Sequence, residues 1–133
     1  MNIALILLKK YDELKIELNV KDNDGWTAFM LACYRGHADV AKVLMENSTT
    51  SSIDLNAKTN GGRTAFIFAC HHGYTSYNGK ASIVELMLDK ADALQLDLTA
   101  KDSGGRTGFQ WAQSYGKTAV VNLIKAKRPS IAV

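Results

Sequence analysis

The stretch that decides the fold is Lys21-Asp-Asn-Asp-Gly-Trp-Thr-Ala-Phe-Met-Leu-Ala-Cys-Tyr-Arg-Gly36, because it occurs two more times along the chain. The second copy is Lys58-Thr-Asn-Gly-Gly-Arg-Thr-Ala-Phe-Ile-Phe-Ala-Cys-His-His-Gly73, and the third is Lys101-Asp-Ser-Gly-Gly-Arg-Thr-Gly-Phe-Gln-Trp-Ala-Gln-Ser-Tyr-Gly116. Six columns are identical in all three copies: Lys21/Lys58/Lys101, Gly25/Gly62/Gly105, Thr27/Thr64/Thr107, Phe29/Phe66/Phe109, Ala32/Ala69/Ala112 and Gly36/Gly73/Gly116. The chain is therefore an array of repeats.

A second motif follows the last glycine of each copy, with apolar residues at positions i, i+3 and i+4. These residues are Val40, Val43 and Leu44, then Ile83, Leu86 and Met87, then Val120, Leu123 and Ile124. Such spacing predicts one face of an amphipathic helix. Ile3, Ile6 and Leu7 match the same motif, so the chain opens within a truncated copy.

The sequence pattern of each repeat predicts an extended arm, a first helix, a turn and a second helix. The first glycine shared by the copies suits a turn with positive φ, the threonine suits an N-cap, and the last glycine suits a helix C-terminus. A unit of this size cannot bury both helices alone, so the copies must stack into an all-α solenoid. We predict one domain over 1–133, with a half repeat at 1–18, repeats at 19–55 and 56–98, and a terminal repeat at 99–133. Residues 74–79 are an insertion in the second complete repeat.

Composition agrees with a single globular domain. The 133 residues are 47% hydrophobic and 22% charged, with one proline, values typical of a soluble fold. The N-terminal apolar run, 3–8, is too short for a membrane span or a signal peptide, so we expect a cytoplasmic or nuclear protein. A net charge of +3 falls short of the dense basic patch of a nucleic-acid binder. We expect neither nucleic acid nor membrane as a partner.

The repeat resembles the ankyrin repeat, whose pattern is Asp-x-x-Gly-x-Thr-Pro-Leu-His-x-Ala followed by a Gly-His-like turn, an Ile-Val-x-x-Leu-Leu helix and an Asp-Val-Asn-Ala arm. The matching stretches are 22–27, 36–37, 39–40, 43–44 and 54–57. Ala28, Ala65 and Gly108 replace the family's proline, and Met30, Ile67 and Gln110 replace its histidine. The family's hydrogen bonding between repeats, from threonine to histidine, is therefore expected to be absent. The connectors are also longer than usual, with the extra residues at 11–15, 49–52 and 92–95.

The resemblance implies a protein-binding module that has no catalytic residues and needs no metal or cofactor. It places the partner surface on the concave face, formed by the arm tips and the exposed side of the first helices. Those positions are Lys21, Asn23, Asp24, Trp26, Tyr34, Arg35, Lys58, Asn60, Arg63, His71, His72, Lys101, Ser103, Arg106, Ser114 and Tyr115. The set holds six Lys or Arg and one acid, which predicts an acidic surface on the partner. We assign the nearby Asp22 and Asp102 to turn geometry.

Several residues invite sharper hypotheses. Trp26 is either a binding hot spot or a residue that packs on the adjacent arm. Cys70, His71 and His72 contain metal-ligand types, but adjacent positions point in different directions on a helix and lack the i, i+4 spacing of helical zinc sites. Cys33 and Cys70 occupy the same small column of neighbouring repeats, so we expect free buried thiols rather than a disulfide.

Two further hypotheses concern the whole chain. The truncated first copy suggests a non-catalytic ankyrin segment of a larger enzyme, channel or receptor, acting as an intramolecular scaffold. The same apolar end, 3–7, would also support self-association, because exposed apolar patches mark contact sites.

Overall fold

A computed structural model describes residues 19–48, 53–71 and 82–133. Within these ranges the chain forms three helix pairs and no β-strand. The pairs are α3 (Ala28–Arg35) with α4 (Ala38–Glu46), α5 (Ala65–His71) with α6 (Ser82–Leu94), and α7 (Gly108–Ser114) with α8 (Thr118–Lys127). A short 3-10 helix, η1 (Pro129–Ile131), follows α8. The predicted all-α class is confirmed.

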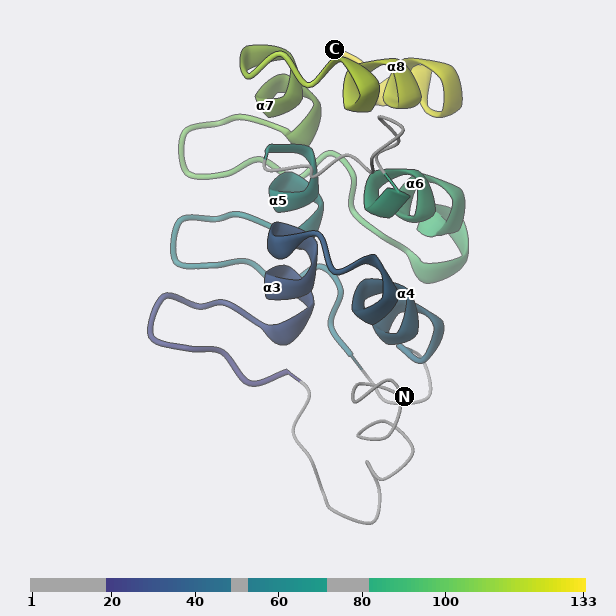
Figure 1. The fold of residues 1–133 in the computed structure, drawn as a ribbon. Helices are drawn as coiled ribbons and strands as arrows, with labels where there is room; N and C mark the ends of the chain where they lie inside the picture. Colours follow the sequence, from purple (N-terminus) through teal and green to yellow (C-terminus); the bar gives the residue numbers. More distant parts are fainter. Residues whose placement is uncertain (1–18, 49–52, 72–81) are drawn as a thin grey trace.

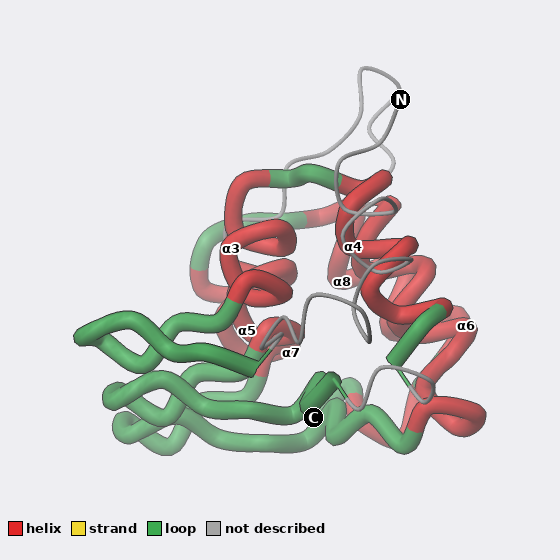
Figure 2. The backbone as a smooth tube through the Cα atoms, turned by 90° about the horizontal axis from the view of Figure 1, so that it is seen from below, coloured by secondary structure: helices red, strands yellow, loops and turns green. Residues whose placement is uncertain are grey.

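The helices stack in two columns. Figure 1 shows α3, α5 and α7 one above the other, with α4, α6 and α8 in a second column beside them. The contacts agree, because α5 packs on both α3 and α7, and α6 packs on both α4 and α8. The arms that precede α3, α5 and α7 project together from the side of the first column, layered as Figure 2 shows. This arrangement is the predicted solenoid.

The first helix of each pair (α3, α5 or α7), which we call the inner helix, begins directly after the predicted threonine. The hydroxyl oxygens of Thr27, Thr64 and Thr107 each accept a hydrogen bond from the backbone N–H three residues later, at 3.3 Å. In two repeats, the residue at the family's histidine position bonds to the threonine of its own repeat. Gln110 Oε1 accepts from the backbone N–H of Thr107 at 3.1 Å, and Met30 Sδ accepts from that of Thr27 at 3.4 Å. Both helices therefore begin with a reciprocal capping box.

The arms bond to one another through their backbones. Gly25, Gly62 and Gly105 turn the three arms with φ of 86°, 77° and 79°, the left-handed region that glycine adopts without a penalty. The N–H of Asn60 donates to the carbonyl of Asp24 at 3.0 Å, and the N–H of Ser103 donates to the carbonyl of Gly61 at 2.9 Å. The arms therefore form a continuous row along the stack.

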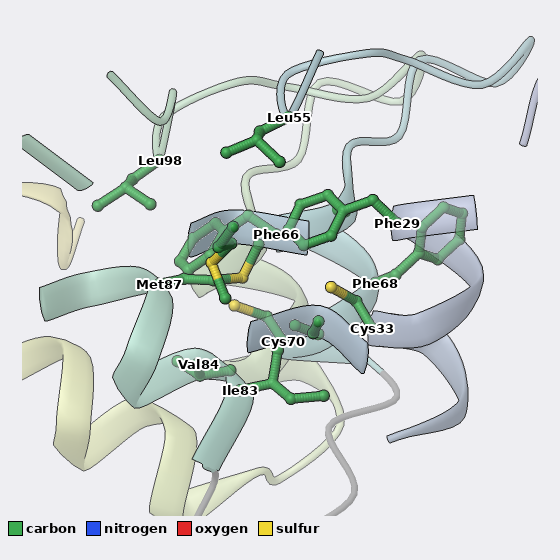
Figure 3. Close-up of a cluster of buried hydrophobic side chains, with 14 of the residues drawn as sticks. Phe29, Cys33, Leu55, Phe66, Phe68, Cys70, Ile83, Val84, Met87 and Leu98 are labelled. Atoms are coloured by element: carbon green, nitrogen blue, oxygen red, sulfur yellow. The ribbon is translucent and has the colours of Figure 1, made fainter. Parts of the chain in front are cut away.

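The core lies between the two helical columns and under the arms. Phe66 and its equivalents in the other repeats are 2–3% exposed, and Figure 3 shows Cys33 and Cys70 within the same buried cluster. Both cysteines are free thiols, as predicted, and burial raises the pKa of each. Gly108 packs tightly against this core, because a Cβ added at this position would lie only 3.0 Å from Cys70 Sγ.

The extra residues before the third repeat extend a helix rather than a connector. α6 has 13 residues, against 9 in α4 and 10 in α8, and it includes 92–94. Gln95 follows directly after α6 and has a φ of 56°. The prediction of a longer connector at 92–95 is therefore wrong for most of that segment. Arg128 Nη1 donates to Asp92 Oδ1 at 3.0 Å, so the added turn also contacts the end of α8.

Several predictions concern residues outside the described ranges. They are the half repeat at 1–18 with its apolar positions, the extra length at 11–15 and 49–52, the insertion at 74–79, and His72. For these residues the sequence-based expectations stay predictions.

Candidate functional site

A groove of about 750 Å³ lies between the row of arms and the inner helices. It is lined by Asp24, Trp26, Thr59, Asn60, Gly61, Arg63, Phe68, Asp102, Ser103, Gly104, Arg106 and Trp111. Six of these residues belong to the predicted concave set: Asp24, Trp26, Asn60, Arg63, Ser103 and Arg106. The structure thus brings predicted residues from all three arms to a single groove.

Trp26 forms the first aromatic contact along the groove. Its ring stacks on Phe68 of the next repeat, with ring centroids 4.1 Å apart and planes 26° from parallel. Tyr34 meets both rings edge-on, at 5.1 and 5.8 Å. Trp26 is therefore half-buried against the neighbouring inner helix, whereas the packing alternative places it on the adjacent arm.

Arg63 makes the equivalent contact one repeat further along. Arg63 occupies the column of Trp26, and its Cζ lies 4.9 Å from the ring centroid of Trp111, which occupies the column of Phe68. The Cζ of Arg106 also lies 4.9 Å from the Trp111 ring. The same ring contacts Tyr115 and His71, with the Tyr115 plane 4° from parallel. Cation–π contacts of this kind are attractive.

Asp102 connects the third arm to Trp111. Its Oδ1 accepts the backbone N–H of Gly104 and of Arg106, each at 3.0 Å, and its Oδ2 accepts the Trp111 indole N–H at 2.7 Å. Arg63 Nε lies 3.9 Å from Oδ2, and the Asp102 side chain is 5% exposed. Partial burial raises the pKa of this carboxyl, but the hydrogen bonds and the Arg63 charge outweigh burial and lower it.

The Trp111→Phe variant is expected to lose about 2 kcal/mol of stability at pH 7, since a hydrogen bond to a charged group is worth about 1.5–3 kcal/mol. The lowered pKa means that ionised Asp102 stabilises the fold above pH 3.8, its ordinary pKa, and that this contribution disappears as pH falls through the folded-state pKa. The difference between wild type and variant should therefore shrink below pH 3.8 in urea titrations. Trp26→Phe is the control, because the Trp26 indole N–H donates no hydrogen bond within the described residues. An equal pH dependence for both variants would contradict the assignment.

Several residues of the predicted set form hydrogen bonds between adjacent arms. Asn60 Nδ2 donates to the Asn23 carbonyl at 3.0 Å, Ser103 Oγ to the Gly61 carbonyl at 2.7 Å, and Lys21 Nζ to the Lys58 carbonyl at 3.0 Å. These side chains hold adjacent arms together. The remaining predicted residues within the described ranges lie outside the groove lining: Tyr34 and His71 are half-buried, and Arg35, Lys101, Ser114 and Tyr115 are exposed.

The hydrogen bonds of Asp22 and Asp102 confirm the assignment of these aspartates to turn geometry. Asp22 Oδ1 accepts the backbone N–H of Asp24 and of Trp26, each at 2.9 Å, as Asp102 does in the third arm.

The groove residues that the sequence analysis missed are the arm residues Thr59, Gly61 and Gly104, and two aromatic residues of the helices, Phe68 and Trp111. Both aromatic residues stand four positions after the N-cap threonine, in the column that Leu31 occupies in the first repeat. The available signal is a large side chain on the inner helix, one position beyond Met30 or Gln110. The contact of Asp102 with Trp111 is likewise absent from the sequence analysis, which assigns that carboxylate to the turn alone.

Neither a metal-ligand cluster nor a membrane-spanning helix occurs in the described part of the chain. Within 19–48, 53–71 and 82–133, no three His, Cys, Asp or Glu side chains come together as a ligand set. No helix found there is long and apolar enough to cross a bilayer.

Stacked helix pairs with projecting arms define the chain as an α-helical repeat solenoid. The family model for ankyrin repeats in three copies matches residues 2–77, more than half of the chain, and the chain belongs to the ankyrin-repeat family. A comparison with curated proteins gives no match. The third copy lies beyond 77, but it has the same arm, the same threonine cap and the same helix pair. Ankyrin repeats generally bind proteins and are generally non-catalytic.

Proposed function

We propose that the chain binds a partner protein through its concave face, with the groove between arms and inner helices as the centre of the interface. The observation that carries this proposal is the groove itself, about 750 Å³ in volume, with Trp26, Phe68 and Trp111 along it and Arg63 and Arg106 beside them. Trp and Arg are enriched at binding hot spots, especially where partly buried rings are already fixed by packing. The groove presents both residue types, with Trp26 stacked on Phe68 and Arg63 and Arg106 beside Trp111.

The charge of the concave face supports a partner with an acidic surface. The exposed or half-buried cations of the proposed face are Lys21, Arg35, Lys58, Arg63, Lys101 and Arg106. Asp102 is engaged by three hydrogen bonds, which leaves Asp24 as the exposed acid of the groove. Complementary charge would speed association and select against basic partners.

We place this interaction in the cytoplasm or nucleus. The supporting feature is the pair of free, buried cysteines, which is the usual state of thiols in reducing compartments. Self-association through the apolar N-terminal positions stays a separate prediction. Sedimentation at several protein concentrations would test it, because self-association raises the apparent mass with concentration.

The experiment that tests the proposed function is affinity capture with two charge-matched variants. Arg63→Gln combined with Arg106→Gln removes two positive charges from the groove, and Lys42→Gln combined with Lys125→Gln removes two from exposed positions on α4 and α8. We expect proteins captured by the wild type to be lost, at least about tenfold, with the groove variant and retained with the outer variant. Equal loss with both variants, while circular dichroism shows both folded, would contradict binding through the concave face.

A further inference from the structure

The third-repeat end of the groove brings two arginines to one tryptophan ring. The Cζ atoms of Arg63 and Arg106 each lie 4.9 Å from the ring centroid of Trp111. A cation–π contact attracts a guanidinium group without using its N–H donors in a hydrogen bond to an acceptor atom. Trp111 therefore draws two sets of N–H donors to the same end of the groove.

Nothing in the described part of the chain satisfies those donors. Arg106 is exposed, and its guanidinium nitrogens make no hydrogen bond or ion pair within the described ranges. Arg63 has one acidic neighbour there, Asp102, whose Oδ2 lies 3.9 Å from Arg63 Nε, too far for a hydrogen bond. Both Asp102 oxygens already accept shorter bonds from Gly104, Arg106 and Trp111. The two arginines thus have unused hydrogen-bonding capacity at one site.

The shape of the site selects among ligands. Trp111 already contacts two guanidinium groups and Tyr115, and Phe68 already stacks on Trp26. A nucleobase would have to displace these contacts to stack on either ring. A planar group with two acceptor oxygens suits the unbonded guanidinium donors instead, because arginine binds carboxylates through two parallel hydrogen bonds. The third arm is also open on its outer side, since a Cβ on Gly105 would meet no atom within 4 Å.

We propose that Arg63 and Arg106 form a carboxylate-binding subsite that takes an Asp or Glu side chain from an acidic peptide segment of the partner. This inference rests on the proposed function and adds the direction in which the bound segment lies along the groove. Asp24 lines the groove from the first arm, whereas both guanidinium groups lie beside Trp111 of α7. The acidic residue of the bound segment therefore lies toward α7, and the segment's uncharged residues lie toward Trp26.

A random-peptide display library tests the subsite directly, because it offers acidic and neutral side chains at every position of the peptide. The wild-type chain is used for selection, and Lys42→Gln combined with Lys125→Gln serves as the charge-matched control. We expect selected peptides to be enriched in Asp or Glu at one fixed position, and to bind the control variant as well as the wild type. A selected peptide and its Glu→Gln or Asp→Asn counterpart are then compared by fluorescence anisotropy.

The expected result is a 10- to 100-fold weaker affinity for the neutral peptide, roughly the range expected for losing a charge-assisted hydrogen bond. Arg106→Gln should weaken the acidic peptide to a similar extent and the neutral peptide little, and Arg106→Lys should restore only part of the loss. The comparison of two peptides on the wild-type chain needs no protein variant, so it holds even if a substitution impairs folding.

Three outcomes would overturn the subsite. Peptides without an acidic preference that still lose binding with Trp26→Ala would reject the subsite and leave the concave face as the binding surface. Peptides that bind both Trp26→Ala and the groove variant Arg63→Gln with Arg106→Gln as well as wild type would reject the groove, and with it the proposed function. Selection of no peptide at all, or of phosphorylated peptides only in a parallel phosphopeptide library, would reject the carboxylate as ligand.

Discussion

Gly62→Ala is expected to destabilise the chain by about 3 kcal/mol, whereas Gly105→Ala is expected to cost only about 1 kcal/mol. Both glycines stand at the same position of their arms, with φ of 77° and 79°, so both substitutions carry the same penalty for left-handed backbone. They differ in their surroundings. A Cβ on Gly62 would lie 3.0 Å from the backbone nitrogen of Ser103 in the next arm, and a Cβ on Gly105 would meet no atom within 4 Å.

The difference between these two variants measures the stacking of adjacent arms. The obstructing atom at Gly62 belongs to the backbone, so it cannot move aside as a flexible side chain would. Urea denaturation followed by circular dichroism gives both free energies of unfolding. Gly25→Ala provides a second case, because its Cβ would lie 2.9 Å from the nitrogen of Asn60. Equal losses for Gly62→Ala and Gly105→Ala would mean that the arms separate easily and contribute little to the stack.

The fold was predictable because each repeat carries local signals that agree with one another. Thr64 precedes an apolar helix and caps it, and Gly62 turns the arm with positive φ. Comparing three copies shows these positions even in the absence of a structure. The longer α6 was not predicted, since alignment locates extra residues but does not assign their conformation. Residues 90–94 include lysine, two alanines and leucine, which favour continuation of the helix.

The groove was only partly predictable, because its contacts join different repeats. The column of Trp26, Arg63 and Arg106 is identified as exposed from its place in the arm. The contact of Trp26 with Phe68, and of Arg63 with Trp111, depends on how far one repeat is shifted against the next. That shift is set by helix packing and is not written in the sequence of a single unit. The bond between Asp102 and Trp111 likewise requires the arm to fold back over α7.

Phe66→Ala is expected to destabilise the whole chain by about 3–5 kcal/mol, the usual cost of removing a buried phenylalanine. Phe109→Ala removes an equally buried ring, since the two residues are 3% and 2% exposed, but it should affect the third repeat more than the others. The reason is position. α5 packs on α3, α6 and α7, whereas α7 packs on α5 and α8, so a cavity beside α5 weakens the interfaces on both of its sides.

Hydrogen exchange resolved by segment separates these two effects. In Phe66→Ala, we expect faster amide exchange in α3, α5 and α7 alike, because repeat arrays gain stability from interfaces between neighbours. In Phe109→Ala, exchange should accelerate mainly in α7 and α8, while α3 and α4 keep their protection. Phe66→Leu is the control, since it keeps most of the buried volume and should lose much less stability. Uniform acceleration in Phe109→Ala would instead show that the stack unfolds as one cooperative unit. The subsite at Arg106 would then share the stability of the first repeat rather than opening separately at the end of the array.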